Sequence, residues 1–524
     1  MEQNAENRKT VFITGASGSM GMASLREIFK NRDTDRRYRL VLLVRDSQKN
    51  RDELKPFADE PNLEIVWGDL LDYEKVRQCV KKADLIVHIA AFVSPAADYH
   101  PDQAMKVNYG STRNLIQAIR ESGGTETKKF VYIGTVAETG DRMPPIHWGR
   151  VGDPIKPSMF DYYAVSKVAA ERLVIEAGLK YWVSLRQTGI MGPDMAKIRD
   201  AIQFHNCLDN VLEYVSDRDS GRLVRNLCAF DAEGALSSDF WGHIYNIGGG
   251  KSCRVSTYDM YRVMYGRMGF TSLTPVMDAR YIATRNFHGQ YYLDSDKLEN
   301  YLHFRHDSME YFYDAYLKAV GNAMGFAQGV NRLPGGQQMM GRIIQGTFEK
   351  MLLSEHGPKR WIQDLEMDRI DAYFGGMRRW VDLPKDPEKM PHFTDWDTVV
   401  RIDHGYDEDK PESELTLDDV KKAAEFRGGA CLSDHMEKGD WTTKLTFRCA
   451  FGHTFEASPR LVLEGGHWCP ECERTSWNYG KRAKVDPFFA QVWTPLHGED
   501  ETREYPKAVS ELDVPAWNAD GSRP

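Results

Sequence analysis

Short apolar runs and helical patterns alternate along the first three hundred residues of the chain. Helical patterns, such as residues 108–123, separate the apolar runs. Seven runs read as buried strands: residues 11–14, 40–45, 63–69, 84–91, 129–135, 182–190 and 243–250. Strands that are apolar throughout and alternate with helices indicate a parallel sheet covered on both faces. We therefore expect an α/β fold built on a doubly wound parallel sheet.

The pattern changes near residue 325. We assign residues 1–325 to the α/β domain and residues 326–425 to a helical, highly charged extension. The extension ends in an acidic, proline-containing segment, residues 403–416, which we interpret as a linker. Residues 426–478 form a small cysteine-rich unit, and residues 479–524 are expected to be a C-terminal tail.

Composition and charge exclude several classes of protein. The chain has 524 residues, of which 41% are hydrophobic, so several cores are expected and general disorder is not. A formal charge of −9 argues against non-specific binding to nucleic acid or to an anionic membrane. No apolar run is long enough for a transmembrane helix, and the N-terminus has no apolar signal region. We expect a cytoplasmic protein with no nucleic-acid or membrane partner.

A glycine-rich turn follows the first predicted strand. Gly15, Gly18 and Gly21 are spaced G-x-x-G-x-x-G, and a helical pattern comes directly after them. Glycines allow the backbone to approach a dinucleotide pyrophosphate, and a helix N-terminus offers free N–H groups to it. A turn with no ligand is the alternative, but the first strand of a doubly wound sheet favours a Rossmann-type cofactor site.

The end of the second strand indicates which dinucleotide binds. Arg45 and Asp46 stand where the adenosine ribose is normally met. We expect Arg45 to pair with the 2′-phosphate of NADP(H), because a guanidinium matches phosphate geometry. The alternative is that Arg45 is only exposed and that Asp46 recognises the free 2′-hydroxyl of NAD(H).

Two adjacent tyrosines and one lysine mark the chemical centre. Tyr163 stands four residues before Lys167, which puts both on one helical face, whereas Tyr162 is offset by about 100°. A nearby ammonium would lower the pKa of Tyr163 and let it exchange a proton with an alcohol or carbonyl.

Together these motifs resemble the extended short-chain dehydrogenases/reductases, which are NAD-dependent epimerase/dehydratase-like. TGASGSMG, GDLLD, HIAA, VNYGSTRNL, YIGTVAETG, YYAVSK and YNIGGG occur in the order of that family. The resemblance covers roughly residues 8–320. It is closest to the branch of dihydroflavonol reductases, 3β-hydroxysteroid dehydrogenases and nucleotide-sugar epimerases.

The resemblance implies roles for individual residues. Thr135, Tyr163 and Lys167 would be catalytic. Asn108 would support the site, or would be a plain polar residue of its helix. Gln187 stands where the family commonly has proline, which puts the nicotinamide contacts that follow it in doubt. The implied cofactor contacts are Gly15, Ser17, Gly18, Ser19, Met20, Gly21, Arg45, Asp69, Leu70, Ala90, Ala91, Asn108, Tyr163, Lys167, Gln187, Thr188 and Ile190.

Three segments are expected to build a small substrate-binding part, namely residues 95–101, 140–160 and 192–206. They are rich in Met, Phe, Trp, Tyr and His, which suits an apolar or aromatic ring better than a nucleotide diphosphate. His147 and His205 either touch the substrate or, as the more probable interpretation of each, are ordinary polar loop residues.

Four residues near the C-terminus have the spacing of a metal site. Cys449 and His453 form C-x-x-x-H, and Cys469 and Cys472 form C-x-x-C, a pattern that resembles a zinc ribbon. We expect a structural Zn²⁺, with Cys431 as an alternative to His453. DNA binding by this unit is the less favoured reading, because its flanks are acidic.

We therefore predict an NADP(H)-dependent oxidoreductase that interconverts an alcohol and a carbonyl on a small, ring-containing apolar substrate. One alternative is a nucleotide-sugar epimerase or dehydratase with tightly bound NAD(P). Another is an NADP-sensing regulatory protein, which would have no need of Thr135, Tyr163 and Lys167 together. The family resemblance also implies a homodimer.

Overall fold

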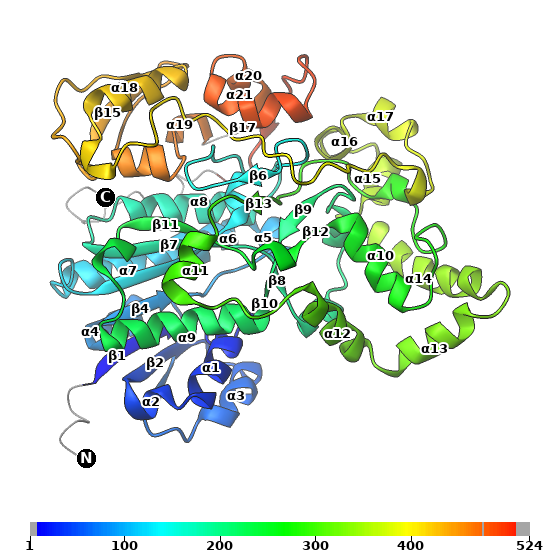
Figure 1. Ribbon diagram of the computed structural model, residues 1–524, viewed down its shortest axis with the longest axis horizontal. Coiled ribbons are helices and arrows are strands. Elements are labelled where there is room, and N and C mark those ends of the chain that lie inside the picture. The colour runs from blue at the N-terminus through cyan, green and yellow to red at the C-terminus, as the bar shows by residue number, and fades with distance from the viewer. Residues whose placement is uncertain (1–7, 474–475, 510–524) are drawn as a thin grey trace.

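The computed structural model describes residues 8–473 and 476–509. A seven-stranded parallel sheet forms its centre, in the order β3-β2-β1-β4-β5-β7-β11 (Figure 1). The strands are β1 (Lys9–Thr14), β2 (Tyr38–Val44), β3 (Leu63–Trp67), β4 (Leu85–His88), β5 (Lys129–Thr135), β7 (Tyr181–Gln187) and β11 (His243–Ile247). The order reverses between β1 and β4, as a doubly wound fold requires. The predicted fold class is confirmed.

Helices cover both faces of the sheet. On one face α1 (Ser19–Lys30) and α9 (Asp217–Glu233) pack Leu25, Ile28, Leu223 and Leu227 into a core with β1 and β4. The other face carries α4 (Tyr73–Lys82), α7 (Gly110–Glu121) and α8 (Tyr162–Ile175). Apolar residues three and four apart on each helix supply these buried faces.

Five predicted strands end earlier than the apolar runs suggested, β2 and β11 among them. β3 stops at Trp67, β4 at His88 and β7 at Gln187. In β4 the reason is local, because the Ala90 N–H donates to the Thr14 hydroxyl at 3.2 Å, and the chain leaves the sheet beside the glycine turn. The early ends place the following residues at the carboxyl edge of the sheet, where doubly wound folds bind ligands.

Short strands and helices form a smaller part beside this edge. Its main elements are β6 (Trp148–Gly149), β8 (Ile190–Met191), β9 (Val211–Glu213), β10 (Val215–Ser216), β12 (Arg254–Ser256), β13 (Tyr291–Tyr292), α10 (Thr257–Arg267), α11 (Asp296–Leu302) and α12 (Met309–Val320). The helical extension follows as α13 (Asn322–Asn331), α14 (Gly336–Leu352), α15 (Pro358–Asp364), α16 (Met367–Phe374) and α17 (Met377–Val381). Trp361, Ile370 and Phe374 of the extension share a core with Tyr162 and Val165 of α8.

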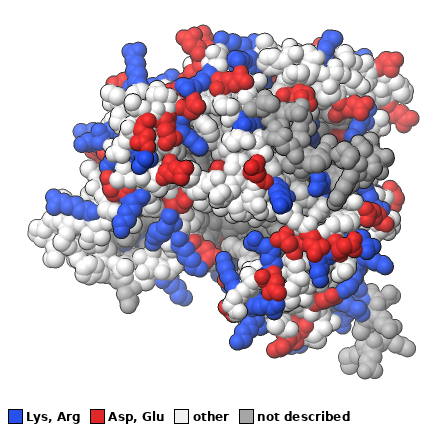
Figure 2. Space-filling model, turned by 180° about the vertical axis from the view of Figure 1, so that it is seen from behind, with Lys and Arg blue, Asp and Glu red and all other residues white. Residues whose placement is uncertain are grey.

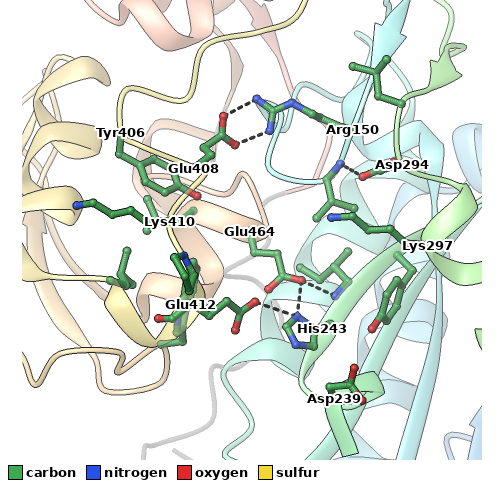
Figure 3. Close-up of a pocket in the computed structure, with 18 of the residues that line it drawn as sticks. Arg150, Asp239, His243, Asp294, Lys297, Tyr406, Glu408, Lys410, Glu412 and Glu464 are labelled. Atoms are coloured by element: carbon green, nitrogen blue, oxygen red, sulfur yellow. Dashed lines mark hydrogen bonds and ion pairs between the residues drawn. The ribbon is translucent and has the colours of Figure 1, made fainter. Parts of the chain in front are cut away.

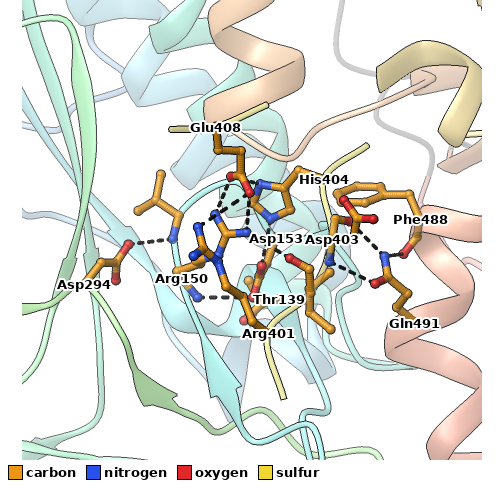
Figure 4. Close-up of polar contacts among 12 residues, drawn as sticks. Thr139, Arg150, Asp153, Asp294, Arg401, Asp403, His404, Glu408, Phe488 and Gln491 are labelled. Carbon is orange, nitrogen blue, oxygen red and sulfur yellow. Dashed lines mark hydrogen bonds and ion pairs between the residues drawn. The ribbon is translucent and has the colours of Figure 1, made fainter. Parts of the chain in front are cut away.

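The segment interpreted as a linker is packed against the α/β domain. His404 is fully buried, with Nε2 3.0 Å from Asp153 and Nδ1 2.6 Å from Glu408. Arg150 contacts Glu408, as Figure 4 shows, and it also donates to the Ile402 carbonyl at 2.8 Å. The segment interpreted as a linker is thus held in place by ion pairs, of Glu408 with Arg150 in the 140–160 loop and of Glu412 with Arg460 in the cysteine-rich unit.

The cysteine-rich unit consists of α18 (Leu417–Phe426), a three-stranded antiparallel sheet and α19 (Pro470–Glu473). The strands are β14 (Ala430–Cys431), β15 (Leu445–Arg448) and β16 (Thr454–Ala457). Leu461, Val462 and Trp468 share a hydrophobic core with Ala170 and Val174 of α8. The unit is therefore joined to the helix that carries Tyr163.

Part of the predicted C-terminal tail is folded. Residues 476–509 contain α20 (Tyr479–Ala483), α21 (Pro487–Trp493), β17 (Ser476–Trp477) and β18 (Tyr505–Pro506). Aromatic residues hold this segment in place, and the Tyr479 hydroxyl donates to the Pro157 carbonyl at 2.7 Å. The rest of the predicted tail, residues 510–524, lies outside the described residues.

The surface carries both signs of charge. Basic and acidic side chains are intermixed over the face shown in Figure 2. Among the described helices, none combines the length and the apolar character needed to cross a membrane.

Candidate active site

The glycine turn is built so that only glycine fits at two positions. Gly15 has a φ of +74°, and a Cβ there would lie 2.6 Å from the Ala90 nitrogen. A Cβ on Gly21 would lie 2.2 Å from the Gly15 oxygen. Gly18 precedes α1, whose N-terminus has no side-chain cap and no acidic residue in its first turn. These features fit a pyrophosphate bound at free helical N–H groups.

A buried histidine that sequence reasoning missed supports this turn. His88 Nδ1 lies 2.8 Å from the Thr14 hydroxyl, and Nε2 lies 3.2 Å from Thr112 on α7. Burial lowers the pKa of His88 to about 3, so the ring is neutral. The contacts tie β1, β4 and α7 together directly behind the predicted pyrophosphate site.

The predicted adenosine contacts lie at the ends of β2 and β3. Arg45 is exposed, whereas Asp46 forms a two-pronged ion pair with Arg51 at 2.7 and 2.8 Å. Asp69 is also exposed, and its carboxylate accepts from the Leu71 N–H at 2.8 Å. The Asp46 carboxylate, which would accept a hydrogen bond from a free 2′-hydroxyl, is thus already paired with Arg51, while Arg45 faces solvent.

Thr135 and Tyr163 meet at the carboxyl end of the sheet. Thr135 ends β5, Tyr163 lies in the first turn of α8, and the Thr135 side chain is near enough to lower the pKa of Tyr163. Asp161 caps α8 by accepting a hydrogen bond from the Ala164 N–H at 2.8 Å, which fixes the start of the helix. Burial raises the pKa of Tyr163, and the carboxyls of Asp161, Glu138 and Asp98 raise it further.

The ammonium group of Lys167 has different contacts from those expected. Its ammonium donates to the Ile133 carbonyl at 2.7 Å and lies 4.0 Å from the centre of the Tyr132 ring. Burial lowers its pKa to about 8. Lys167 is not among the main groups that act on Tyr163, so the predicted lowering of the tyrosine pKa is absent in this conformation.

Asn108 lies in a π-helical turn, residues 105–109, and its side chain connects two segments of the site. Its Nδ2 donates to the Phe92 carbonyl at 2.9 Å and to the Ser166 hydroxyl at 2.8 Å, and its Oδ1 accepts from the Phe92 N–H at 2.7 Å. Every polar atom of this buried amide is used to hold the chain after Ala90 and Ala91 against α8. These contacts suit a residue that supports the geometry of the active site.

Gln187 ends β7 at the predicted nicotinamide position. Its Nε2 donates to the Thr188 carbonyl at 2.9 Å, while its buried Oε1 has no hydrogen-bond partner in the described structure. Thr188 is buried and Ile190 begins β8. A buried acceptor without a partner is costly, so Oε1 fits a ligand that brings an N–H donor.

The three segments predicted to bind substrate meet around a narrow cavity of about 30 Å³. Asp98, Phe160 and His205 represent the three segments in its wall. The helical extension adds a fourth side that the sequence did not reveal. The remaining lining residues are Ser94, Pro95, Tyr99, Ser158, Asp161, Ile202, Asn286, Phe287, His288, His356, Trp361, Arg369 and Tyr373.

The two candidate histidines have different surroundings. His205 is buried beside Trp361 and Tyr373, and burial lowers its pKa to about 4. His147 is fully buried elsewhere, with Nε2 2.9 Å from the Trp396 carbonyl. Only His205 lines the cavity.

Asp98 was not predicted as a site residue, although it belongs to a predicted segment. Its carboxylate accepts from the Tyr163 N–H at 3.1 Å. Burial and the neighbouring Asp161 raise its pKa to about 8, so it is largely protonated at neutral pH.

A second buried cluster lies behind the catalytic helix. Arg186 on β7 pairs with Glu171 of α8 at 2.6 Å and lies 3.5 Å from Glu138. His467 of the cysteine-rich unit lies 3.0 Å from Glu171. These residues are up to 329 positions apart in the chain, so no local pattern could have predicted them.

The four predicted metal ligands converge. Nδ1 of His453 lies 3.4, 3.6 and 3.4 Å from the sulfurs of Cys449, Cys469 and Cys472, and the sulfurs of Cys449 and Cys472 are 3.6 Å apart. Tetrahedral zinc with ordinary bond lengths requires separations of about 3.5 to 3.8 Å. Cys431 is not in the cluster, so the alternative in which it replaces His453 is wrong.

A second, larger cavity lies away from this chemistry. It measures about 990 Å³ and lies between β11, α11 and the segment 399–415, which leads into the cysteine-rich unit (Figure 3). Glu464 lies 3.1 Å from His243, and Arg150 contacts Glu408. The charged side chains that meet there largely neutralise one another, and Thr135, Tyr163 and Lys167 do not line it.

Residues 11–215 match the model of the NAD dependent epimerase/dehydratase family. The 3 beta-hydroxysteroid dehydrogenase/Delta 5-->4-isomerase of Vaccinia virus (strain Ankara) is 29% identical over 196 residues, which are 34% of this chain and 52% of that protein. The UDP-N-acetylglucosamine 4,6-dehydratase (inverting) of Campylobacter jejuni is 24% identical over 172 residues, 33% of this chain and 44% of that protein. The match thus spans about half the length of these curated relatives.

Among solved structures, the dTDP-glucose 4,6-dehydratase DesIV of Streptomyces venezuelae, with NAD and TYD bound, is similar to this chain. It shares 23% identity and a TM-score of 0.47, over 60% of this chain and 99% of that one.

Proposed function

We propose that residues 11–215, a domain of the NAD dependent epimerase/dehydratase family, carry the catalytic centre of an NADP(H)-dependent oxidoreductase. The reaction would interconvert an alcohol and a carbonyl on a small, ring-containing substrate. One observation carries the proposal: the Thr135 side chain, at the end of β5, lies near Tyr163, which shares α8 with Lys167 and whose N–H donates to Asp98 in the cavity wall. A cofactor sensor would have no use for that proton-transfer set.

Each residue of the site would have its own role in this reaction. Tyr163 would give its proton to the carbonyl oxygen, and Thr135 would hold the same oxygen. Lys167 would move from the Ile133 carbonyl toward the cofactor ribose and Tyr163, which would lower the tyrosine pKa. The dinucleotide, when bound, supplies or accepts the hydride; the glycine turn and Gln187 would hold its two ends.

Arg45 supports a preference for NADP(H). Its guanidinium is exposed at the end of β2, and the neighbouring Asp46 is neutralised by Arg51. An arginine so placed can pair with a 2′-phosphate, whereas Asp46 would have to leave Arg51 to accept from a 2′-hydroxyl.

Cofactor titration tests the proposal. We expect NADPH to bind more tightly than NADH to the purified chain, and Arg45→Ala to remove that preference. Tyr163→Phe should keep NADPH binding and lose turnover on a panel of ketones. Preference for NADH, or a nucleotide that copurifies and does not exchange, would favour the epimerase or dehydratase alternative.

The cysteine-rich unit would hold a structural Zn²⁺ through Cys449, His453, Cys469 and Cys472. The separations of the four ligand atoms support this role, and all four positions are taken by protein groups, as in closed structural sites. We propose that this unit and the helical extension stabilise and complete the catalytic domain.

A further inference from the structure

The helical extension places one arginine in the wall of the small cavity, in which Asp98 accepts a hydrogen bond from the Tyr163 N–H. Arg369 on α16 lines this cavity together with Asp98 and Asp161. Its guanidinium lies 3.8 Å from the centre of the Phe160 ring and 5.6 Å from that of Trp361. Stacking on aromatic faces leaves the N–H groups of a guanidinium free in its own plane.

Arg369 forms no ion pair with a carboxylate in the described part of the chain, although two carboxyl groups share the cavity. Tyr373 lies near enough for Arg369 to act on the pKa of the Tyr373 hydroxyl. Asp98 receives the Tyr163 N–H and is largely protonated, while Asp161 caps α8 and lies 3.5 Å from His288. Both carboxyl groups are thus committed to other partners, and the guanidinium keeps donors for a ligand.

The stacking partner of Arg369 is held in a costly conformation. Phe160 has a φ of +69°, in the left-handed region that bulky residues avoid. Asn286, itself at +71°, fixes it by accepting from the Met159 N–H at 2.8 Å and donating to the Met159 carbonyl at 3.0 Å. Such strain persists where the surrounding structure imposes it, commonly at ligand sites. Phe160 precedes the cap of α8, which ties the arginine's position to that of Tyr163.

We propose that Arg369 is the specificity-determining residue that binds a carboxylate group of the substrate, whose apolar or aromatic body lies against Phe160, Trp361 and Tyr373. The proposal rests on the proposed function, because it assigns Arg369 to the substrate of Tyr163, whose N–H donates to Asp98 in the same cavity wall. A carboxylate fits better than a phosphate, since one guanidinium serves it and Asp161 would repel a dianion more strongly than a monoanion.

Benzoate and benzamide test the proposal, because both carry a benzene ring and only benzoate carries a negative charge. Binding to the NADPH-saturated chain is followed by calorimetry and by tryptophan fluorescence, since Trp361 lines the cavity. We expect benzoate to bind at least tenfold more tightly than benzamide. Arg369→Gln should weaken benzoate about 10- to 100-fold and leave benzamide unchanged, with Arg369→Lys between them.

Arg360→Gln is the matched control, because Arg360 belongs to the same extension but is paired with Asp364 outside the cavity. Benzoate binding that is absent, or that is unchanged in Arg369→Gln, would overturn the proposal. Phenyl phosphate binding more tightly than benzoate would overturn the assignment to a carboxylate. Unchanged benzamide binding would also show that the Arg369→Gln variant retains its cavity. If NADPH itself fails to bind, the proposed function fails, while benzoate binding to the cofactor-free chain still tests the arginine.

Discussion

The buried cluster of Glu138, Glu171, Arg186 and His467 makes a prediction about which carboxylate is charged. Burial and the adjacent Glu171 raise the pKa of Glu138 well above its ordinary value, whereas Arg186 and His467 lower that of Glu171. We therefore expect the ion pair of the cluster to be that of Glu171 with Arg186, with Glu138, 3.5 Å from the guanidinium, as the carboxyl that takes up a proton more readily.

Each glutamate is replaced by glutamine, alone and together, so that shape is kept and only charge is removed. Glu138→Gln should lower the free energy of unfolding by less than about 1 kcal/mol, because a neutral group replaces a neutral group. Glu171→Gln should cost about 1 to 3 kcal/mol, since Glu138 can ionise and take over part of the pairing. The double variant leaves Arg186 without a counter-charge and should cost about 3 to 5 kcal/mol.

Urea denaturation at pH 7, followed by tryptophan fluorescence, measures the four free energies of the cycle. We expect a coupling of about 1 to 2 kcal/mol between the two sites. Glu74→Gln, in an exposed pair with Arg77, is the control and should change stability by at most about 1 kcal/mol. Additive effects would show that Glu138 does not replace Glu171. A Glu138→Gln variant as unstable as Glu171→Gln would show that Glu138 is already ionised.

Three further predictions concern the cofactor turn, the cavity and the cysteine cluster. Gly21→Ala should weaken NADPH binding at least tenfold, because its Cβ would meet the Gly15 oxygen; Gly346→Ala, in open space on α14, should not, as titration would show. The raised pKa of Asp98 gives stability that is present below about pH 4 and lost as pH rises toward 8, so thermal denaturation should find the advantage of Asp98→Asn over wild type growing across that range. Metal analysis should find one zinc per chain, absent in Cys469→Ser and retained in Cys431→Ser.

Local patterns carried most of what the sequence predicted. The strands around the glycine turn were recognisable because apolar runs and glycine spacing are features of a few adjacent residues. Tyr163 and Lys167 share a helical face for the same reason. The direction in which Lys167 points was not predictable, because it depends on the Ile133 carbonyl and the Tyr132 ring of a different element.

Contacts between distant segments were outside the reach of sequence reasoning. Arg369 looks like one charge among many on a helical extension, and only folding brings it to Phe160, 209 positions earlier. His404 lies in a segment whose acidity and proline suggested a linker, yet it is buried between Asp153 and Glu408. Composition describes the average behaviour of a segment and does not reveal a partner elsewhere that neutralises its charge.

Segments after the predicted boundary near residue 325 share hydrophobic cores with the α/β domain. The segment 465–468 makes the argument concrete: the Gly465 carbonyl accepts from Arg186 at 2.7 Å, His467 contacts Glu171, and the Trp468 carbonyl accepts from Arg172 at 2.8 Å. Two of these partners lie on α8, the helix of Tyr163 and Lys167, and the third lies on the neighbouring strand. Removing the cysteine-rich unit would leave Arg186 and Glu171 without these partners and expose the apolar face of α8. The catalytic domain is consequently expected to depend on its C-terminal half for stability, although the family match ends at residue 215.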